Sequence, residues 1–214
     1  YGNTWSNGKS VYMQLKQDAD GHDLDPTDPD NWTVPTPIYR NDASLLNGNK
    51  QLAATASGGV GMSLDMTYFQ DADGRSYYAW QQLGATYIAT MDPKDPAHVT
   101  SSPVRIVTPE YAWNAAIAEG PNVTMRDGKL YLMFSGSGVG KTYTTGLAVA
   151  DAAGSDLTDP ASWTALNYPI QKSGPFNGEM QLGTGHGMWS EDEDGNQIYV
   201  FHAYATKNLG SVNA

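Results

Sequence analysis

The 214-residue chain has no cysteine, few basic residues and no long apolar run. Without cysteine, neither a disulfide framework nor a thiolate metal site can form. Only 12 lysines and arginines stand against 23 acidic residues, so the net charge is −11, which argues against nucleic acid or an anionic membrane surface as a partner. No stretch of 18 apolar residues is present, and we therefore expect no membrane-spanning helix.

Helical periodicity is also scarce, whereas glycine and aromatic residues are abundant. The chain has 23 glycines, 13 tyrosines and six tryptophans, a composition typical of a turn-rich all-β protein with aromatic surfaces. Its length is enough to bury a sizeable core as one large domain or two small ones. It begins with Tyr1, without an initiator methionine or a signal peptide, so we expect a chain that has been cut or processed at its front.

A Gly-centred turn followed by an alternating aromatic strand occurs three times. The turn glycines are Gly74, Gly128 and Gly195, each preceded by an aspartate. Asp-Gly between two β-rich runs is the strongest short signal for a β-hairpin. We therefore expect three hairpins of related structure.

A second repeated segment is an Asp-Pro turn, which alternates along the chain with the Asp-Gly hairpins. Its copies begin at Asp28, Asp95 and Asp159. Together the two segments define a unit of strand, Asp-Gly turn, two further strands, Asp-Pro turn and a short last strand. Repeated four-stranded units of roughly 40–50 residues or more indicate a β-propeller.

The phase of the repeat predicts a single, incomplete propeller domain over residues 1–214. Its divisions are 1–56 for the outer part of blade 1, 57–110 for blade 2, 111–175 for blade 3 and 176–214 for the inner part of blade 4. This amounts to about three blade-equivalents, and a closed propeller needs at least about four.

The first strand of each repeat, which lines the central channel of a propeller, carries one polar residue at matching distance from its turn. Asp65, Glu119 and His186 each lie nine residues before a turn glycine. This spacing predicts that the three side chains converge at one height of the channel. They could satisfy one another around buried water, but two carboxylates at a cleft are also what glycoside hydrolysis requires.

Tryptophans accompany these positions and could serve as platforms for sugar rings. Trp80, Trp113 and Trp189 lie near the candidate residues in the sequence. Each of them could equally be a core residue or fill the space between blades. We treat all three as candidate substrate-binding residues.

The sequence around the three positions resembles glycoside hydrolase family 43. The motifs are Leu64–Phe69 before Asp71–Gly74, Ala118–Pro121 before Asp127–Leu132, and Gly185–Gly187. The run Pro109–Asn114 shortly ahead of Glu119 is similar to the α-L-arabinofuranosidase branch of that family. The resemblance covers nearly the whole chain, and the motifs are specific only in combination.

The resemblance implies a five-bladed propeller that hydrolyses arabinan, arabinoxylan or xylan side groups with inversion at the anomeric carbon. Glu119 would be the general acid, and Asp65 would orient this acid and raise its pKa. His186 would lie beneath the sugar, where some members hold a calcium or other ion; no cofactor is required otherwise. A polymeric plant substrate favours a secreted or cell-surface bacterial protein.

The family's general base is an aspartate on the first strand of blade 1, which we expect upstream of Tyr1. None of the aspartates near the start of the chain fits that role. The resemblance also leaves open a β-xylosidase or an endo-arabinanase, and a carbohydrate-binding propeller without activity is the alternative from another class. A protein-interaction propeller would show no convergence of carboxylates.

A polypeptide of residues 1–214 alone should therefore hydrolyse 4-nitrophenyl α-L-arabinofuranoside poorly, because it would hold the acid without the base. Release of 4-nitrophenol over time measures this. Robust turnover by this polypeptide would show that the base lies within these residues.

Overall fold

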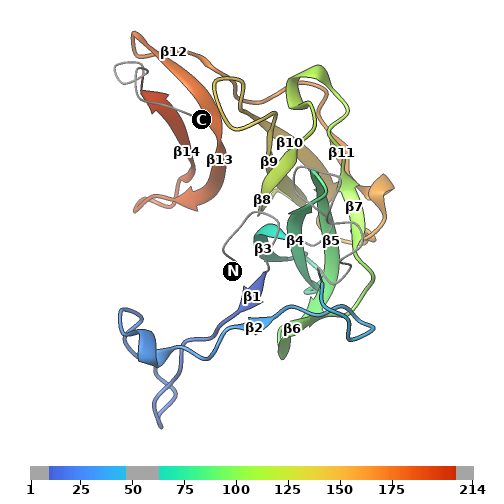
Figure 1. The fold of residues 1–214 in the computed structure, drawn as a ribbon, viewed down its shortest axis with the longest axis vertical. Helices are drawn as coiled ribbons and strands as arrows, with labels where there is room; N and C mark the ends of the chain where they lie inside the picture. Colours follow the sequence, from blue (N-terminus) through green and yellow to red (C-terminus); the bar gives the residue numbers. More distant parts are fainter. Residues whose placement is uncertain (1–9, 47–62, 206–214) are drawn as a thin grey trace.

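The structure is a computed structural model that describes residues 10–46 and 63–205. These residues form antiparallel sheets and short 3-10 turns, with no α-helix among them. No helix in the described ranges is long and apolar enough to cross a membrane. The predicted all-β class is confirmed, and the sheets form part of a propeller (Figure 1).

Two large sheets and one smaller sheet follow one another along the chain. The first contains β3 (Leu64–Gln70), β4 (Ser76–Gln82), β5 (Ala85–Asp92) and β6 (Asp95–Val99), and β7 (Val104–Val107) also pairs with β5. The second contains β8 (Ala118–Arg126), β9 (Lys129–Gly136), β10 (Thr144–Asp151) and β11 (Thr164–Ala165). The third contains β12 (Gly174–Phe176), β13 (Glu179–Glu191) and β14 (Gln197–Ala205).

The first strands of successive repeats lie against one another. β3 contacts β8, and β8 contacts β13, as inner strands of adjacent propeller blades do. The predicted ranges 57–110 and 111–175 each enclose one of the two large sheets. The outer limits of the predicted blades, at residues 1, 56, 57 and 214, lie outside the described residues, so this division of the chain stays a prediction.

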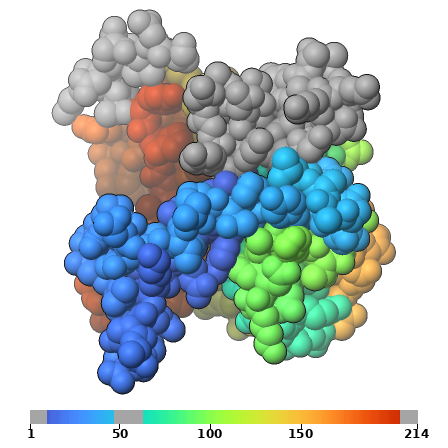
Figure 2. Space-filling view, turned by 60° about the horizontal axis from the view of Figure 1, so that its bottom comes forward, coloured from blue at the N-terminus to red at the C-terminus, as the bar shows by residue number. Residues whose placement is uncertain are grey.

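Residues 10–46 form an extended segment that runs along one face of the molecule (Figure 2). Within it, β1 (Val11–Tyr12) pairs with β2 (Thr36–Pro37). The segment joins the first large sheet where the backbone of Tyr39 bonds to Ala97 and Val99, at 2.8 and 3.0 Å. The Tyr39 ring also stacks on His98, with centroids 5.3 Å apart.

Two of the three Asp-Gly hairpins have the same five-residue turn. In both, the first aspartate, Asp71 or Asp192, accepts hydrogen bonds from the backbone N–H four residues later, at 2.8 Å. The third turn, between β8 and β9, has only Asp127 and Gly128 between paired residues, and both have positive φ, 50° and 74°. This is the two-residue hairpin that an Asp-Gly pair favours.

Two of the three Asp-Pro segments also repeat one structure. Asp28 and Asp159 each cap a one-turn 3-10 helix by accepting a backbone N–H at 2.9 Å. The following Trp32 and Trp163 each donate their indole N–H to a carbonyl six residues earlier. The third segment differs, because Asp95 and the residues after it form β6, an outer strand of its sheet where proline is tolerated.

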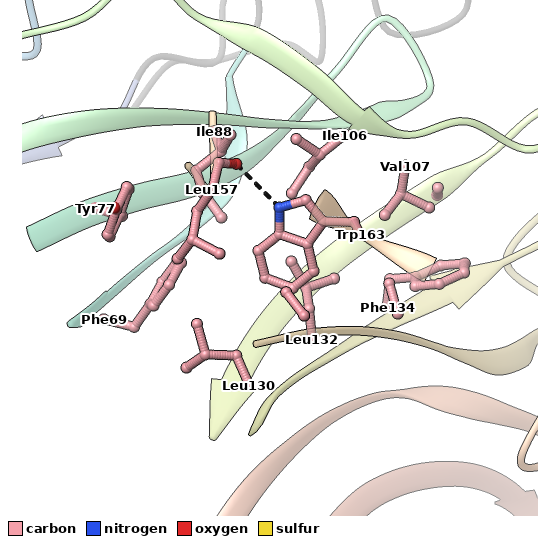
Figure 3. Close-up of a cluster of buried hydrophobic side chains, with 14 of the residues drawn as sticks. Phe69, Tyr77, Ile88, Ile106, Val107, Leu130, Leu132, Phe134, Leu157 and Trp163 are labelled. Atoms are coloured by element: carbon pink, nitrogen blue, oxygen red, sulfur yellow. Dashed lines mark hydrogen bonds between the residues drawn. The ribbon is translucent and has the colours of Figure 1, made fainter. Parts of the chain in front are cut away.

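The main core lies between the two large sheets. It is built from side chains of β3, β4, β5, β7, β8, β9 and β10, together with Leu157 and Trp163. Figure 3 shows Trp163 among these side chains, with its indole N–H bonded to the Leu157 carbonyl at 3.0 Å. Burial of these large apolar groups is the dominant favourable contribution to folding.

The turn after β3 joins the two large sheets. Asp71 is buried and accepts hydrogen bonds from the guanidinium of Arg75 at 2.7 Å and from the Tyr77 hydroxyl at 3.0 Å. Arg75 in turn donates to the carbonyl of Ser155, in the loop between β10 and β11 of the second sheet, at 2.6 Å. Burial and the hydrogen bond to Asp71 raise the pKa of Tyr77, so its hydroxyl stays a donor.

Replacing Asp71 with alanine should lower the free energy of unfolding by about 3 kcal/mol, because it leaves the buried Tyr77 hydroxyl without its partner and breaks the ion pair with Arg75. Urea unfolding of the variant measures this. The control is Asp192→Ala, in the equivalent turn where the carboxylate is solvated, and its effect should be much smaller. Equal losses in the two variants would contradict the role of burial.

Candidate active site

All three inner strands share a register shift of one extra residue at the same place, and β13 has a second shift between Leu182 and Gly185. The pairing of β3 with β4, of β8 with β9 and of β13 with β14 shifts register between Leu64 and Thr67, Glu119 and Asn122, and Gly185 and Met188. The first residue inside each shift has positive φ: Asp65 at 55°, Gly120 at 60° and His186 at 48°. A β-bulge of this kind redirects side chains and is frequent next to active sites.

The equal spacing of Asp65, Glu119 and His186 from their turn glycines therefore does not mean structural equivalence. Asp65 and His186 occupy the bulge itself, whereas Glu119 precedes it and pairs with Ser135. The expectation of equivalent positions is wrong by one residue. The reason is that the glycine comes two positions earlier in the turn between β8 and β9, whereas the paired segment before it is one residue longer, so the count to Gly128 is one shorter.

The predicted convergence of the three residues is nevertheless present. A carboxylate oxygen of Asp65 accepts the backbone N–H of Gly120 at 3.1 Å. The other oxygen lies 3.8 Å from Nε2 of His186. Asp65 thus contacts the backbone beside Glu119 on one side and the imidazole on the other.

Tyr143 connects Glu119 to His186. Its hydroxyl donates a hydrogen bond to Oε1 of Glu119 at 2.5 Å and lies 3.3 Å from Nδ1 of His186. The tyrosine is fully buried, and burial together with the bond to Glu119 raises its pKa. It therefore remains protonated and holds the glutamate in one orientation.

The environment of Glu119 favours its protonated form. Its half-buried position raises the pKa of the carboxyl, because burial penalises the charged form. The hydrogen bond from Tyr143 acts in the opposite direction, the charge of Asp65 raises the pKa further, and His186 lowers it. The net direction is upward, as a general acid requires.

The glycines around His186 make room for aromatic rings. A Cβ at Gly185 would collide with the ring of Tyr143, and a Cβ at Gly187 would collide with the ring of Tyr199. Tyr199 bonds to Thr145 of β10 at 2.5 Å. The two glycines of the Gly-His-Gly motif therefore let the rings of Tyr143 and Tyr199 pack directly against the backbone of β13 on either side of His186 in the sequence.

Three residues of the site were not predicted. Tyr143 precedes β10, Ser135 accepts the backbone N–H of His186 at 2.7 Å, and His202 stacks on Tyr143 with centroids 5.7 Å apart. Burial, followed by the effect of His186, lowers the pKa of His202. All three lie outside the first strands of the repeats, and nothing in the spacing of the repeats indicates them.

The three tryptophans have different surroundings. Trp80 is fully buried in a second core with Tyr78 and stacks on Tyr87, so the prediction that it contacts sugar is wrong. The Trp80 ring is buried because every residue of β4 is buried, so both faces of this strand are covered by protein. Trp113 lines a cavity beside the site, whereas Trp189, partly buried, tilts against Tyr199; a role in substrate binding stays a prediction for both.

The residues around His186 do not form a protein cage for a metal. In the described ranges, one group of three metal-binding side chains lies close together, Asp18, Asp20 and His22, and all three are exposed. Calcium takes six to eight oxygen ligands, which His186 and the carboxylate of Asp65 do not supply. An ion near His186, held through water, remains an expectation from the resemblance.

A half-buried glutamate with a raised pKa lies next to a second carboxylate on the inner strands of a propeller, and glycoside hydrolases use such carboxylate pairs. Residues 48–213 match the sequence model of the family described as "Glycosyl hydrolases family 43". The chain belongs to this family.

Relatives and solved structures agree with this assignment. The chain is 33% identical over 159 residues to an extracellular exo-α-(1→5)-L-arabinofuranosidase of Streptomyces chartreusis, which covers 69% of this chain and 46% of the relative. It is 32% identical over 152 residues to α-L-arabinofuranosidase 43 of Humicola insolens, and this match covers 65% of this chain and 30% of the relative. The crystal structure of an α-L-arabinofuranosidase from Lactobacillus brevis is similar with a TM-score of 0.67 and 25% identity, over 92% of this chain and 63% of that one. The chain thus spans less than half the length of these curated relatives.

Replacing Tyr143 with phenylalanine should raise the pKa of Glu119, because the hydroxyl stabilises the ionised carboxylate. The carboxyl would stay protonated to higher pH. The pH at which an activity that needs this acid declines on the basic side would therefore also rise. Carbon-13 NMR titration of the Glu119 carboxyl in the full-length protein measures the shift.

Two variants serve as controls for this experiment. Tyr199→Phe removes a similar hydroxyl that bonds to Thr145 and not to Glu119, so it should leave the titration unchanged. Asp65→Asn removes a repulsive charge and should lower the pKa of Glu119. A shift of the same sign in the Tyr143 and Asp65 variants would contradict the electrostatic arrangement.

Proposed function

We propose that the chain carries the acid half of an inverting glycosidase that releases terminal α-L-arabinofuranose from arabinan or arabinoxylan. The observation that carries the proposal is the environment of Glu119: burial raises its pKa, and a hydrogen bond from Tyr143 fixes one of its oxygens. The relatives named above support arabinofuranose as the sugar released.

Glu119 would act as the general acid. As water attacks the anomeric carbon, the bond from that carbon to the leaving oxygen breaks, and the proton of Glu119 passes to this oxygen. The attacking water loses its proton to a base on the opposite face of the sugar, which gives inversion. Tyr143 stabilises the carboxylate that Glu119 becomes.

Asp65 would be a positioning residue with two effects. Its charge keeps the pKa of Glu119 high, and its hydrogen bond to the N–H of Gly120 fixes the backbone next to the acid. Both effects need the left-handed conformation of Asp65, which directs the carboxylate toward the adjacent strand. His186 would bind the sugar from the exposed side of the cluster.

The general base would be contributed by a part of the protein outside the described residues. An inverting pair needs carboxyl groups about 6.5–9.5 Å apart, with the sugar and a water between them. Among the described residues, Asp65 is the carboxylate linked by hydrogen bond or ion pair to the Glu119 cluster, and it already holds Gly120.

The proposed substrates are plant polysaccharides or their oligosaccharides, processed outside the cell. Two relatives are named extracellular enzymes, and the acidic chain suits a neutral polymer better than a polyanion such as nucleic acid. β-Xylosidase and endo-arabinanase activity are the nearest alternatives. A binding propeller without activity would hold sugar yet lack turnover.

In the full-length protein, Glu119→Gln should reduce turnover of an arabino-oligosaccharide by about 100-fold or more, because a general acid contributes about that much. Sugar binding should change little, since glutamine keeps the shape and the bond to Tyr143. Turnover of 4-nitrophenyl α-L-arabinofuranoside should fall less, because its leaving group needs little protonation. Product formation from both substrates measures the difference.

Glu110→Gln is the matched control, since Glu110 is an exposed glutamate in the loop before β8. It should leave both rates unchanged. An equal loss on the two substrates, or undiminished turnover by the Glu119 variant, would show that Glu119 is not the acid.

A further inference from the structure

The cavity that Trp113 lines has a volume of about 400 Å³. It is lined by side chains of three loops: Ala112, Trp113, Ser137, Lys141, Thr142, Thr144, Pro169, Lys172 and Ser173. Its volume falls in the range of small-ligand sites. None of the roles proposed above uses it, apart from the sugar-binding role predicted for Trp113.

Two residues that line the cavity are close in sequence to residues of the proposed active site. Thr142 directly precedes Tyr143, whose hydroxyl bonds to Glu119. Ser137 follows Ser135 by two residues, and Ser135 pairs with Glu119.

The walls are held in place by hydrogen bonds across three loops. Ser173 donates to the carbonyl of Lys141 at 2.7 Å and accepts the N–H of Gly183 at 2.8 Å. Ser137 donates to the hydroxyl of Thr142 at 3.1 Å. Trp113 is fixed by its indole bond to the carbonyl of Asn167 at 3.0 Å.

Two lysines give the cavity a charge opposite to that of the chain. Lys141 and Lys172 both line it and are exposed. Neither ammonium group has a carboxylate within 4.0 Å in the part of the chain that the structure describes, whereas Lys129 is paired with Asp151. In a chain of net charge −11, two unpaired cations on one cavity form a local site for an anion.

We infer that this cavity is a subsite for a uronic acid, a sugar unit that bears a carboxylate, within the proposed polysaccharide substrate. The ammonium groups of Lys141 and Lys172 would bind the carboxylate. The hydroxyls of Ser137 and Thr142 would bind sugar hydroxyls, and Trp113 with Pro169 provides an apolar wall for the ring. The position of the subsite relative to the reaction depends on the proposed function, whereas its charge preference does not.

The test compares binding of D-glucuronate and D-glucose to the full-length protein in the Glu119→Gln background, which prevents turnover. NMR chemical-shift titration gives both dissociation constants. Glucuronate should bind more tightly than glucose, and its affinity should fall as salt is raised because exposed charges are screened. Inorganic phosphate serves as a competing anion without a sugar ring.

The double variant Lys141→Met and Lys172→Met should weaken glucuronate binding by about tenfold, the loss of a charge-assisted contact, and leave glucose unchanged. Lys94→Met, an exposed lysine in the turn between β5 and β6, is the matched control and should change neither. Thermal melting checks that the exposed substitutions leave the fold intact.

The subsite is overturned if glucuronate binds no better than glucose, if the double variant binds it as well as the parent, or if phosphate alone binds. These results are independent of the activity. Lysine-dependent glucuronate binding in a protein without arabinofuranosidase turnover would reject the proposed function and keep the subsite. Turnover without preferential binding of glucuronate would reject the subsite and keep the proposed function.

Discussion

The register shift that the three inner strands share determines where Asp65 and His186 point. A regular strand would send alternate side chains to opposite faces of the blade. At Asp65 and His186 the backbone instead adopts positive φ, which costs about 1–2 kcal/mol for a residue other than glycine. Contacts around the bulge offset this cost, such as the hydrogen bond that the N–H of His186 donates to the Ser135 hydroxyl. As a result, side chains from three strands lie close together.

The electrostatics of the site follow from the close approach of Asp65, Glu119 and His186. Burial and the charge of Asp65 raise the pKa of Glu119, whereas the hydrogen bond from Tyr143 favours its ionised form. These opposing influences suit an acid that must give up its proton during the reaction and regain it afterwards. The same tyrosine lies near His186, so the acid and the predicted sugar-binding residue share one support.

Much of this arrangement could be predicted from the sequence because it depends on local signals. Asp-Gly turns, Asp-Pro turns and alternating strands are read over a few residues, and they indicated the repeat and the inner strands. The offset of Glu119 from the bulge could not be read, since it depends on which residues pair across the hairpin. Tyr143 and the burial of Trp80 depend on how neighbouring sheets pack, which the spacing within one repeat does not encode.

The position of Tyr143 has a consequence for the coupling between blades. Its ring sits where Gly185 of the third sheet has no side chain, it stacks on His202 of the same sheet, and its hydroxyl bonds to Glu119 of the second sheet. Because that hydrogen bond is stronger to the ionised glutamate, loss of the proton from Glu119 favours the one orientation of Tyr143 in which its ring also packs against the third sheet. A ligand that fixes this orientation of Tyr143 would, by linkage, lower the pKa of the acid.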